Sequence, residues 1–160
     1  MAFNISTVTT QAAATAVETF FLNDSKLVPF LWGAYGVAKS SIVKSIVASL
    51  SETTGNQWGF LDLRASQIDA VDTRCVPEII DHETDFAPPR WLPNVERDGE
   101  HGVTFIDEIL LGMPSVQAGL YQLMTDGRLG SYIHPKGWHI VAASNRPEDA
   151  AGVHGRVDAA

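Results

Sequence analysis

The chain has 160 residues, enough to bury one sizeable core but too few for two large domains. Hydrophobic residues make up 45% and charged residues 19%, and no apolar run approaches the length of a membrane span, so the composition is that of an ordinary globular protein. With 19 acidic against 11 basic residues, the formal net charge of −8 argues against non-specific binding to nucleic acid.

The N-terminal residues and the cysteine content bear on the cellular setting. The sequence starts without the basic cluster and apolar run of a secretion signal. Cys75 is the only cysteine, so no internal disulfide can form. Together these features predict a reducing, cytoplasmic setting.

The first half of the chain contains three periodic segments. We expect residues 1–26 to form an N-terminal helical segment and residues 27–160 to form the main core. Apolar residues recur at near-helical spacing over 11–22, which predicts an amphipathic helix. The apolar run 28–32, closed by a glycine, predicts a buried strand, and helical spacing returns over 39–50.

Further strands and helices alternate towards the C-terminus. Continuous apolar character predicts strands at 58–63, 103–106 and 139–143. Pro114 opens another helix, whose expected inner face is Val116, Leu120, Leu123 and Met124. Buried strands alternating with helices indicate an α/β fold with a mainly parallel sheet covered on both faces.

Two segments depart from this alternation. Residues 64–99 are rich in proline and irregular, and we expect loops and short elements that project from the core rather than a separate domain. Residues 128–138 contain two short runs around Pro135–Gly137, which predict a hairpin with its turn at those residues.

A glycine-containing loop lies between the first predicted strand and the following helix. Glycines let backbone N–H groups converge on a phosphate at the N-terminus of a helix, Lys39 would place a cation on the β and γ phosphates, and Ser40 would offer a hydroxyl to Mg²⁺. The simpler interpretation is a turn that happens to contain Lys-Ser. Ala38 stands where the usual pattern has glycine. The candidate nucleotide-binding residues are Gly33, Ala34, Tyr35, Gly36, Val37, Ala38, Lys39, Ser40 and Ser41.

Polar side chains end two of the later predicted strands. Asp107 and Glu108 follow 103–106, where Asp107 is a candidate Mg²⁺ ligand and Glu108 a candidate base for an attacking water. Asn145 follows 139–143 and could hydrogen-bond a γ-phosphate or that water. Each also has a simpler interpretation, as a strand leaving the core or as a turn residue. Because ligands bind at the carboxyl ends of parallel strands, the three motifs together predict one site.

In this order, the lysine loop, the acidic pair and Asn145 resemble the AAA+ ATPases, and within them the MoxR-type branch. The stretches 63–72 and 87–93 and the 128–138 hairpin are also similar to that branch, and the resemblance covers 27–149. It implies a P-loop NTPase core with Walker A, Walker B and sensor 1 positions, with Lys39, Glu108 and Asn145 catalytic and Ser40 and Asp107 at the metal.

The resemblance also implies parts that are not recognisable before Ala160, namely an arginine finger after sensor 1 and a C-terminal helical lid, so the core is expected to be incomplete. Arg156 is a candidate finger, although an arginine near a terminus is more simply read as solvated. Five histidines without metal-ligand spacing make a structural zinc site a poor fit.

The resemblance favours an ATPase that uses ATP and Mg²⁺, assembles as a homo-oligomeric ring (a hexamer in this family) and remodels a protein client away from the membrane. An alternative is a non-hydrolysing module that binds ATP or ADP, or serves assembly. A third interpretation, a DNA-linked motor, is disfavoured by the acidic charge.

Overall fold

The structure is a computed structural model that describes residues 7–145. Its core is a four-stranded sheet in the order β1-β8-β5-β2, formed by β1 (Phe30–Trp32), β8 (Trp138–Ser144), β5 (His101–Asp107) and β2 (Trp58–Arg64). All three neighbouring pairs in this sheet are parallel. The predicted parallel α/β architecture is confirmed.

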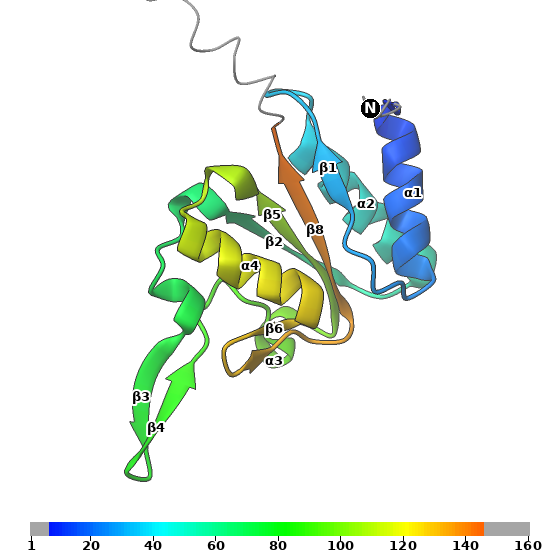
Figure 1. The fold of residues 1–160 in the computed structure, drawn as a ribbon. Coiled ribbons are helices and arrows are strands. Elements are labelled where there is room, and N and C mark those ends of the chain that lie inside the picture. Colours follow the sequence, from blue (N-terminus) through cyan, green and yellow to red (C-terminus); the bar gives the residue numbers. More distant parts are fainter. Residues whose placement is uncertain (1–6, 146–160) are drawn as a thin grey trace, which may run out of the picture.

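Helices cover both faces of the sheet (Figure 1). α1 (Thr10–Leu22) and α2 (Lys39–Thr54) lie on one face, where they bury Phe21, Ile46 and Leu50 against residues of β5 and β8. α4 (Pro114–Asp126) covers the other face with the predicted residues Val116, Leu120 and Leu123 buried and Met124 partly buried. Alternate residues of β5 and β8 supply the two cores, as the period of two in a strand requires.

Close packing around Trp138 explains two glycines in the sheet. A Cβ atom added at Gly102 would lie 2.6 Å from the Trp138 ring, and one added at Gly59 would lie 2.8 Å from it. Both strands therefore need glycine where the indole crosses them, and the indole Nε1 donates to the carbonyl of Gly99 at 3.0 Å. This packing holds the amino ends of β2, β5 and β8 together.

The irregular region contains more order than the sequence indicated. Its short elements are η1 (Ala65–Gln67), η2 (Asp72–Arg74) and α3 (Val95–Asp98). Between η2 and α3, the antiparallel strands β3 (Val76–Ile80) and β4 (Glu83–Ala87) form a hairpin that projects from the core (Figure 1). Projection was expected, but the hairpin itself was not.

The hairpin predicted over 128–138 is present, with its turn elsewhere. β6 (Arg128–Leu129) and β7 (Tyr132–Ile133) pair around Gly130–Ser131, so the predicted turn at Pro135–Gly137 is wrong. The physical reason is that Gly130 has φ +59°, which suits glycine, whereas Lys136 and Gly137 turn the chain into β8.

A further short element, η3 (Ile109–Leu111), follows β5. Within residues 7–145, no helix combines the length and apolar character needed to cross a bilayer.

A buried histidine makes stability depend on pH. His134 is buried, with Nε2 3.1 Å from the Thr104 hydroxyl, and desolvation lowers its pKa from 6.5 to about 4. In the unfolded chain the His134 imidazole takes up a proton near pH 6.5, whereas in the folded chain it stays neutral down to about pH 4. The free energy of unfolding therefore loses nothing to His134 above pH 6.5. It falls as the pH decreases from 6.5 to 4, and the total loss is about 3 kcal/mol. Burial lowers the pKa of His139 too, which adds loss in the same direction.

Urea unfolding at about pH 7 and about pH 5 measures this effect, because these two values lie on either side of the pKa of histidine in the unfolded chain. We expect the wild type to be less stable at the lower pH and His134→Gln to show a smaller difference between the two conditions. His82→Gln, in the exposed hairpin turn, is the matched control and should keep the wild-type difference. A wild type equally stable at both values would contradict the prediction.

Candidate functional site

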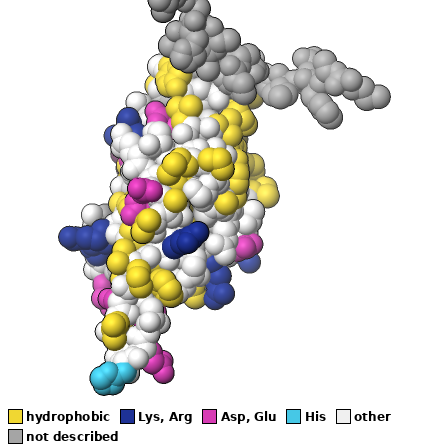
Figure 2. Space-filling view, turned by 60° about the vertical axis from the view of Figure 1, so that its left-hand side comes forward, with side chains coloured by type: hydrophobic (Ala, Val, Ile, Leu, Met, Phe, Trp, Pro, Cys, Tyr) yellow, Lys and Arg dark blue, Asp and Glu magenta, His cyan; other side chains and the backbone are white. Residues whose placement is uncertain are grey.

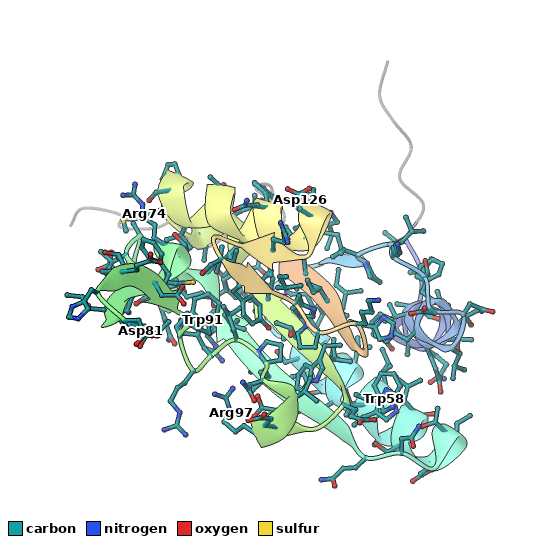
Figure 3. The ribbon with its side chains drawn as sticks, turned by 90° about the horizontal axis from the view of Figure 1, so that it is seen from below. Trp58, Arg74, Asp81, Trp91, Arg97 and Asp126 are labelled. Atoms are coloured by element: carbon teal, nitrogen blue, oxygen red, sulfur yellow. The ribbon has the colours of Figure 1, made fainter. Side chains whose placement is uncertain are left out.

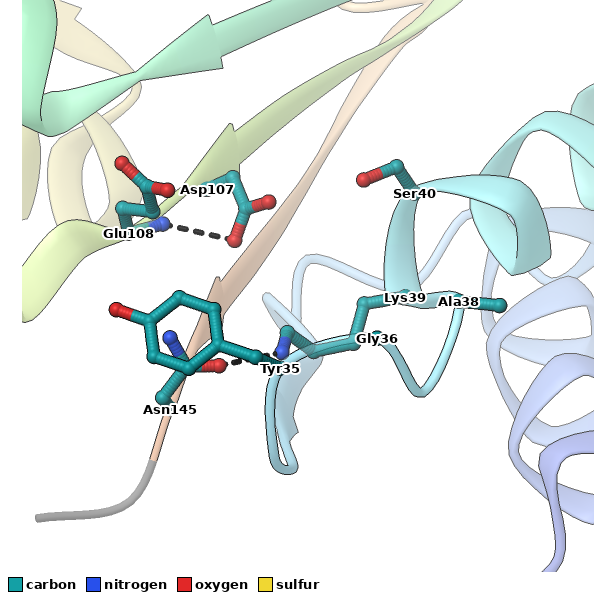
Figure 4. Close-up of a pocket in the computed structure, with 8 residues that line it drawn as sticks. All are labelled: Tyr35, Gly36, Ala38, Lys39, Ser40, Asp107, Glu108 and Asn145. Atoms are coloured by element: carbon teal, nitrogen blue, oxygen red, sulfur yellow. Dashed lines mark hydrogen bonds between the residues drawn. The ribbon is translucent and has the colours of Figure 1, made fainter. Parts of the chain in front are cut away.

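The carboxyl ends of three strands meet at one cavity of about 170 Å³. The loop after β1 supplies Tyr35, Gly36 and Ala38, and the start of α2 supplies Lys39 and Ser40. Asp107 and Glu108 at the end of β5, and Asn145 after β8, complete the lining (Figure 4). The parallel register brings these ends together, because β8 lies between β1 and β5. The structure thus brings the three sequence motifs to one place.

Lys39 ties the loop to the end of β8. Its Nζ donates to the backbone carbonyls of Gly33 (2.8 Å) and Ala34 (3.1 Å) and to Asn145 Oδ1 (2.7 Å). These bonds use all three donors of the ammonium group. Since the oxygen of Asn145 faces Lys39, its amide N–H groups are the atoms it would offer to an anion. Lys39 and Asn145 are therefore joined by a direct hydrogen bond, which links the loop after β1 to the end of β8.

The N-terminus of α2 is open to an anion. Its N-cap is Ala38, which provides no side-chain cap, and its first turn contains no acidic residue. By contrast, the Thr9 hydroxyl accepts from Ala12 N at 3.2 Å and caps α1. Free N–H groups and the helix dipole both favour negative charge at such an end. The cavity thus faces an uncapped helix start beside a lysine, which suits a phosphate.

Ala38 adopts a backbone conformation that favours glycine. Its φ of +62° and ψ of +31° lie in the left-handed region, which costs a residue with a Cβ roughly 1–2 kcal/mol. Glycine at this position would adopt the same conformation without strain. The loop therefore holds Ala38 in a conformation that the glycine of the usual pattern would adopt more readily.

Ala38→Gly should raise the free energy of unfolding by about 0.5–1 kcal/mol, because relief of strain exceeds the entropy gained by the unfolded chain. Ala34→Gly is the matched control in the same loop. Ala34 has no positive φ, so this change should lower stability instead. Urea unfolding of the two variants beside the wild type measures both changes. Equal losses in the two variants would show that the Ala38 conformation is not strained.

The acidic pair has a constrained backbone. Glu108 has φ +56°, and its N–H donates to Asp107 Oδ1 at 2.8 Å. The Ser66 hydroxyl donates a hydrogen bond to Glu108 Oε2. Ser66 lies in η1, directly after β2, the strand that pairs with β5. The position of the Glu108 carboxylate is thus set by a residue from the neighbouring strand end.

Ser66 was missed in the sequence. It stands in the irregular region and belongs to none of the motifs. The signal available was its place just after a predicted strand, since side chains at such ends converge.

The remaining predicted site residues lie around the cavity in different ways. Gly33 and Ala34 contribute through their carbonyl groups, which accept from Lys39. Val37 lines a neighbouring cleft, and Ser41 is exposed on α2 without lining the cavity. Arg156 lies outside the described residues.

The donor set fits a magnesium ion. The Asp107 carboxylate and the Ser40 hydroxyl line the same cavity, and both are oxygen donors. Mg²⁺ is usually held by one or two protein oxygens, with water and substrate phosphates completing the octahedron. The adjoining Lys39 and helix start would hold those phosphates. The two side chains therefore match the kind of protein ligand that Mg²⁺ takes beside a bound nucleotide.

Comparisons with known proteins bear on the fold. No protein-family model matches the sequence, and no curated protein matches it. Among solved structures, NtrX from Brucella abortus is similar with a TM-score of 0.54 and 13% identity, over 94% of this chain and 33% of that one. NtrX in complex with ADP has the same TM-score and 15% identity, over 96% and 34%. The RuvB Holliday junction branch migration motor of Thermotoga maritima scores 0.51 with 19% identity, over 87% and 38%.

The chain spans about a third of the length of these solved structures. Identities of this size show shared architecture and leave substrates and partners to be argued from the residues. The chain therefore shares its α/β fold, a parallel sheet with helices on both faces, with NtrX and RuvB.

Proposed function

We propose that this chain is an ATP-binding AAA+ module of the MoxR type, which hydrolyses ATP with Mg²⁺ to remodel a protein partner. One observation carries the nucleotide site: Lys39, Ser40, Asp107, Glu108 and Asn145 line a single cavity at the uncapped start of α2. A cation, free backbone N–H groups and two carboxylates are the groups that phosphoryl transfer to water requires. The remodelling role rests on the sequence resemblance.

The size of the cavity supports a nucleotide whose base lies elsewhere. A volume of about 170 Å³ is smaller than that of usual ligand pockets, roughly 300–1,000 Å³, and suits phosphate groups. A mainly apolar cleft of about 430 Å³ adjoins it, and Lys39 lines both. The side chains of Val8, Trp32 and Val37 line this cleft and offer apolar surface to a base.

Each residue has a defined task in this proposal. Lys39 turns from the loop carbonyls to the β and γ phosphates, and the N–H groups of α2 hold phosphate oxygens. The amide of Asn145 donates to the γ-phosphate or orients the attacking water. The carboxylate of Glu108 accepts a proton from that water. Ser40 and Asp107 would hold Mg²⁺, which supplies charge neutralisation when bound.

The alternative is a module that binds nucleotide without hydrolysing it. The hydrogen bond from Ser66 to Glu108 favours this alternative, because it occupies an oxygen of the proposed base. A ring assembly, as the resemblance implies, could release that bond through a neighbouring subunit. The two candidates share the binding site and differ only in turnover.

The test is to measure binding of a fluorescent ATP analogue and release of phosphate over a range of protein concentrations, with Mg²⁺ and with EDTA. We expect binding in the micromolar range, as is common for nucleotide enzymes, and turnover that needs Mg²⁺ and rises with concentration. Absence of binding under every condition would overturn the proposal. Binding without turnover at the highest concentration would favour the alternative.

Ser66→Ala should raise turnover per subunit about threefold or more without changing ATP affinity. Hydrogen bonds to a charged group are worth about 1.5–3 kcal/mol, so the loss of this bond frees a carboxylate oxygen to accept a proton from water. Ser45→Ala, an exposed serine of α2 that does not line the cavity, is the control and should leave turnover unchanged. A fall in turnover would mean that Ser66 holds Glu108 in its working position.

A further inference from the structure

Among the described residues that line the nucleotide cavity, only Tyr35 is aromatic. In the same loop, Gly36 and Ala38 also line this cavity. Gly33 and Val37 instead line the apolar cleft proposed for the base, and Tyr35 does not line that cleft. The loop therefore directs its tyrosine towards the phosphates rather than towards the base.

The side chain of Tyr35 lies at the opening of the cavity, since it lines the cavity and is 54% exposed. Figure 4 shows the ring extending away from the start of α2, with its hydroxyl on the side where Glu108 and Asn145 lie. In the proposed function, the phosphates follow Lys39 and the free N–H groups of α2, and Glu108 and Asn145 act at the γ-phosphate. The Tyr35 hydroxyl is thus at the γ-phosphate end of the cavity.

The Tyr35 hydroxyl is available to a ligand. It has no hydrogen-bond partner among the described residues, whereas the hydroxyl of Tyr132 donates to the carbonyl of Pro93 at 2.7 Å. A phenolic hydroxyl donates one hydrogen bond, and a phosphate oxygen is a strong acceptor. Tyr35 therefore has a donor to offer where the γ-phosphate would lie.

Exposure of an aromatic ring does not by itself indicate a function. Figure 2 shows hydrophobic side chains, a class that includes tyrosine in that view, spread over one face of the molecule down to the projecting hairpin. Single exposed side chains of this kind are normal on protein surfaces. Tyr35 differs from them because it lines a cavity beside the cation of Lys39 and the carboxylates of Asp107 and Glu108.

The charges of the cavity make a further donor useful. Among the described lining residues, Lys39 is the only cation, while Asp107 and Glu108 are both acidic. The γ-phosphate brings negative charge and acceptor oxygens that ADP lacks. A neutral hydroxyl donates to these oxygens in a charge-assisted hydrogen bond, which is stronger than one between neutral groups. Such a bond favours the nucleotide that carries the third phosphate.

We propose that Tyr35 makes the site favour a nucleoside triphosphate over a diphosphate, because its hydroxyl donates a hydrogen bond to the γ-phosphate. The ring covers that phosphate on its solvent side. The inference rests on the proposed function for the position of the phosphates, and it adds a residue that distinguishes ATP from its hydrolysis product. Weaker binding of ADP lets the product leave before the next ATP binds.

Competition against the fluorescent ATP analogue tests this proposal in the presence of Mg²⁺, with the affinity of the analogue measured for each variant. The unlabelled competitors are ADP and an ATP analogue with nitrogen in place of the β,γ-bridging oxygen, which is not hydrolysed during the titration. Tyr35→Phe removes only the hydroxyl. It should weaken the triphosphate at least about fivefold and leave ADP within about twofold of the wild type. Tyr35→Ala, which also removes the ring, should weaken the triphosphate at least as much.

Tyr121→Phe is the matched control. Tyr121 is 41% exposed, belongs to α4 and does not line the cavity. In Figure 3, which labels Asp126 at the end of α4, this helix lies on the opposite side of the sheet from α2. The control should leave both affinities within about twofold of the wild type. Urea unfolding without nucleotide should show that each Tyr35 variant is folded, because the change alters an exposed side chain in a loop.

An equal loss of affinity for both nucleotides in Tyr35→Phe would overturn the inference, because a hydroxyl that only shapes the loop affects every phosphate. Unchanged affinity for the triphosphate would also overturn it, while the proposed function would stand as long as binding still depends on Lys39. If the wild type binds neither nucleotide, the proposed function fails and this inference fails with it.

Discussion

Lys39→Ala should weaken ATP binding by about 10- to 100-fold, the loss expected when charge-assisted hydrogen bonds worth about 1.5–3 kcal/mol are removed. The structure gives the reason for so large an effect from one side chain. Lys39 Nζ is already placed by Gly33, Ala34 and Asn145 at the mouth of the loop. A phosphate would exchange these partners for its own oxygens by turning a side chain that is already ordered, so little further conformational entropy is lost on binding.

Titration with the fluorescent ATP analogue measures the affinity directly, and thermal or urea unfolding provides a second measure. A ligand at 100 times its dissociation constant stabilises the wild type by about 2.7 kcal/mol, and this gain should largely vanish in Lys39→Ala. Unfolding without ligand shows whether the variant is folded.

Lys44→Ala is the matched control, since Lys44 belongs to the same helix and carries the same charge. Its Nζ lies 5.5 Å from the centre of the Phe60 ring, and it does not line the cavity. Removing this side chain should leave the ATP affinity within about twofold of the wild type, because Lys44 is exposed and solvent screens its charge. Equal losses in the two variants would mean that α2 attracts the nucleotide only through its general charge. Unchanged binding in Lys39→Ala would refute the phosphate loop.

The sheet was predictable because its two central strands, β5 and β8, are buried on both faces. Continuous apolar runs such as 103–106 and 139–143 are typical of parallel strands under two helical layers. The β3–β4 hairpin escaped prediction for the opposite reason. Its strands are exposed on both faces, contain Pro77 and mix acidic with apolar residues, so neither periodicity nor composition distinguishes them from a loop.

The site was predictable as far as its motifs lie at strand ends. Lys39, Asp107 and Asn145 follow three different apolar runs, and parallel topology alone brings such ends together. Two features depend on the three-dimensional fold and cannot be inferred from the sequence. The left-handed conformation of Ala38 is stabilised by the loop around it rather than by its own preference. The contact of Ser66 with Glu108 joins residues 42 apart in sequence and depends on how η1 leaves β2.

Glu108→Gln should reduce ATP turnover by about 10²- to 10⁴-fold while leaving ATP affinity unchanged, because general-base catalysis contributes about that much. The amide is nearly the same shape as the carboxylate and can still accept a hydrogen bond from Ser66. What it cannot do is accept the proton of the attacking water. Phosphate release and binding of the fluorescent analogue, measured on the same preparation, separate the chemical step from nucleotide capture.

Glu100→Gln is the control for this substitution, since Glu100 is exposed, precedes β5 and does not line the cavity. It should turn over ATP like the wild type. A wild type with no turnover even when concentrated would make Glu108→Gln indistinguishable from it, and the enzyme proposal would fail while nucleotide binding through Lys39 still stood. If instead Glu108→Gln retained most of the wild-type rate, the base would have to be another group. The Ser66 contact would then serve only to hold the end of β5 against η1.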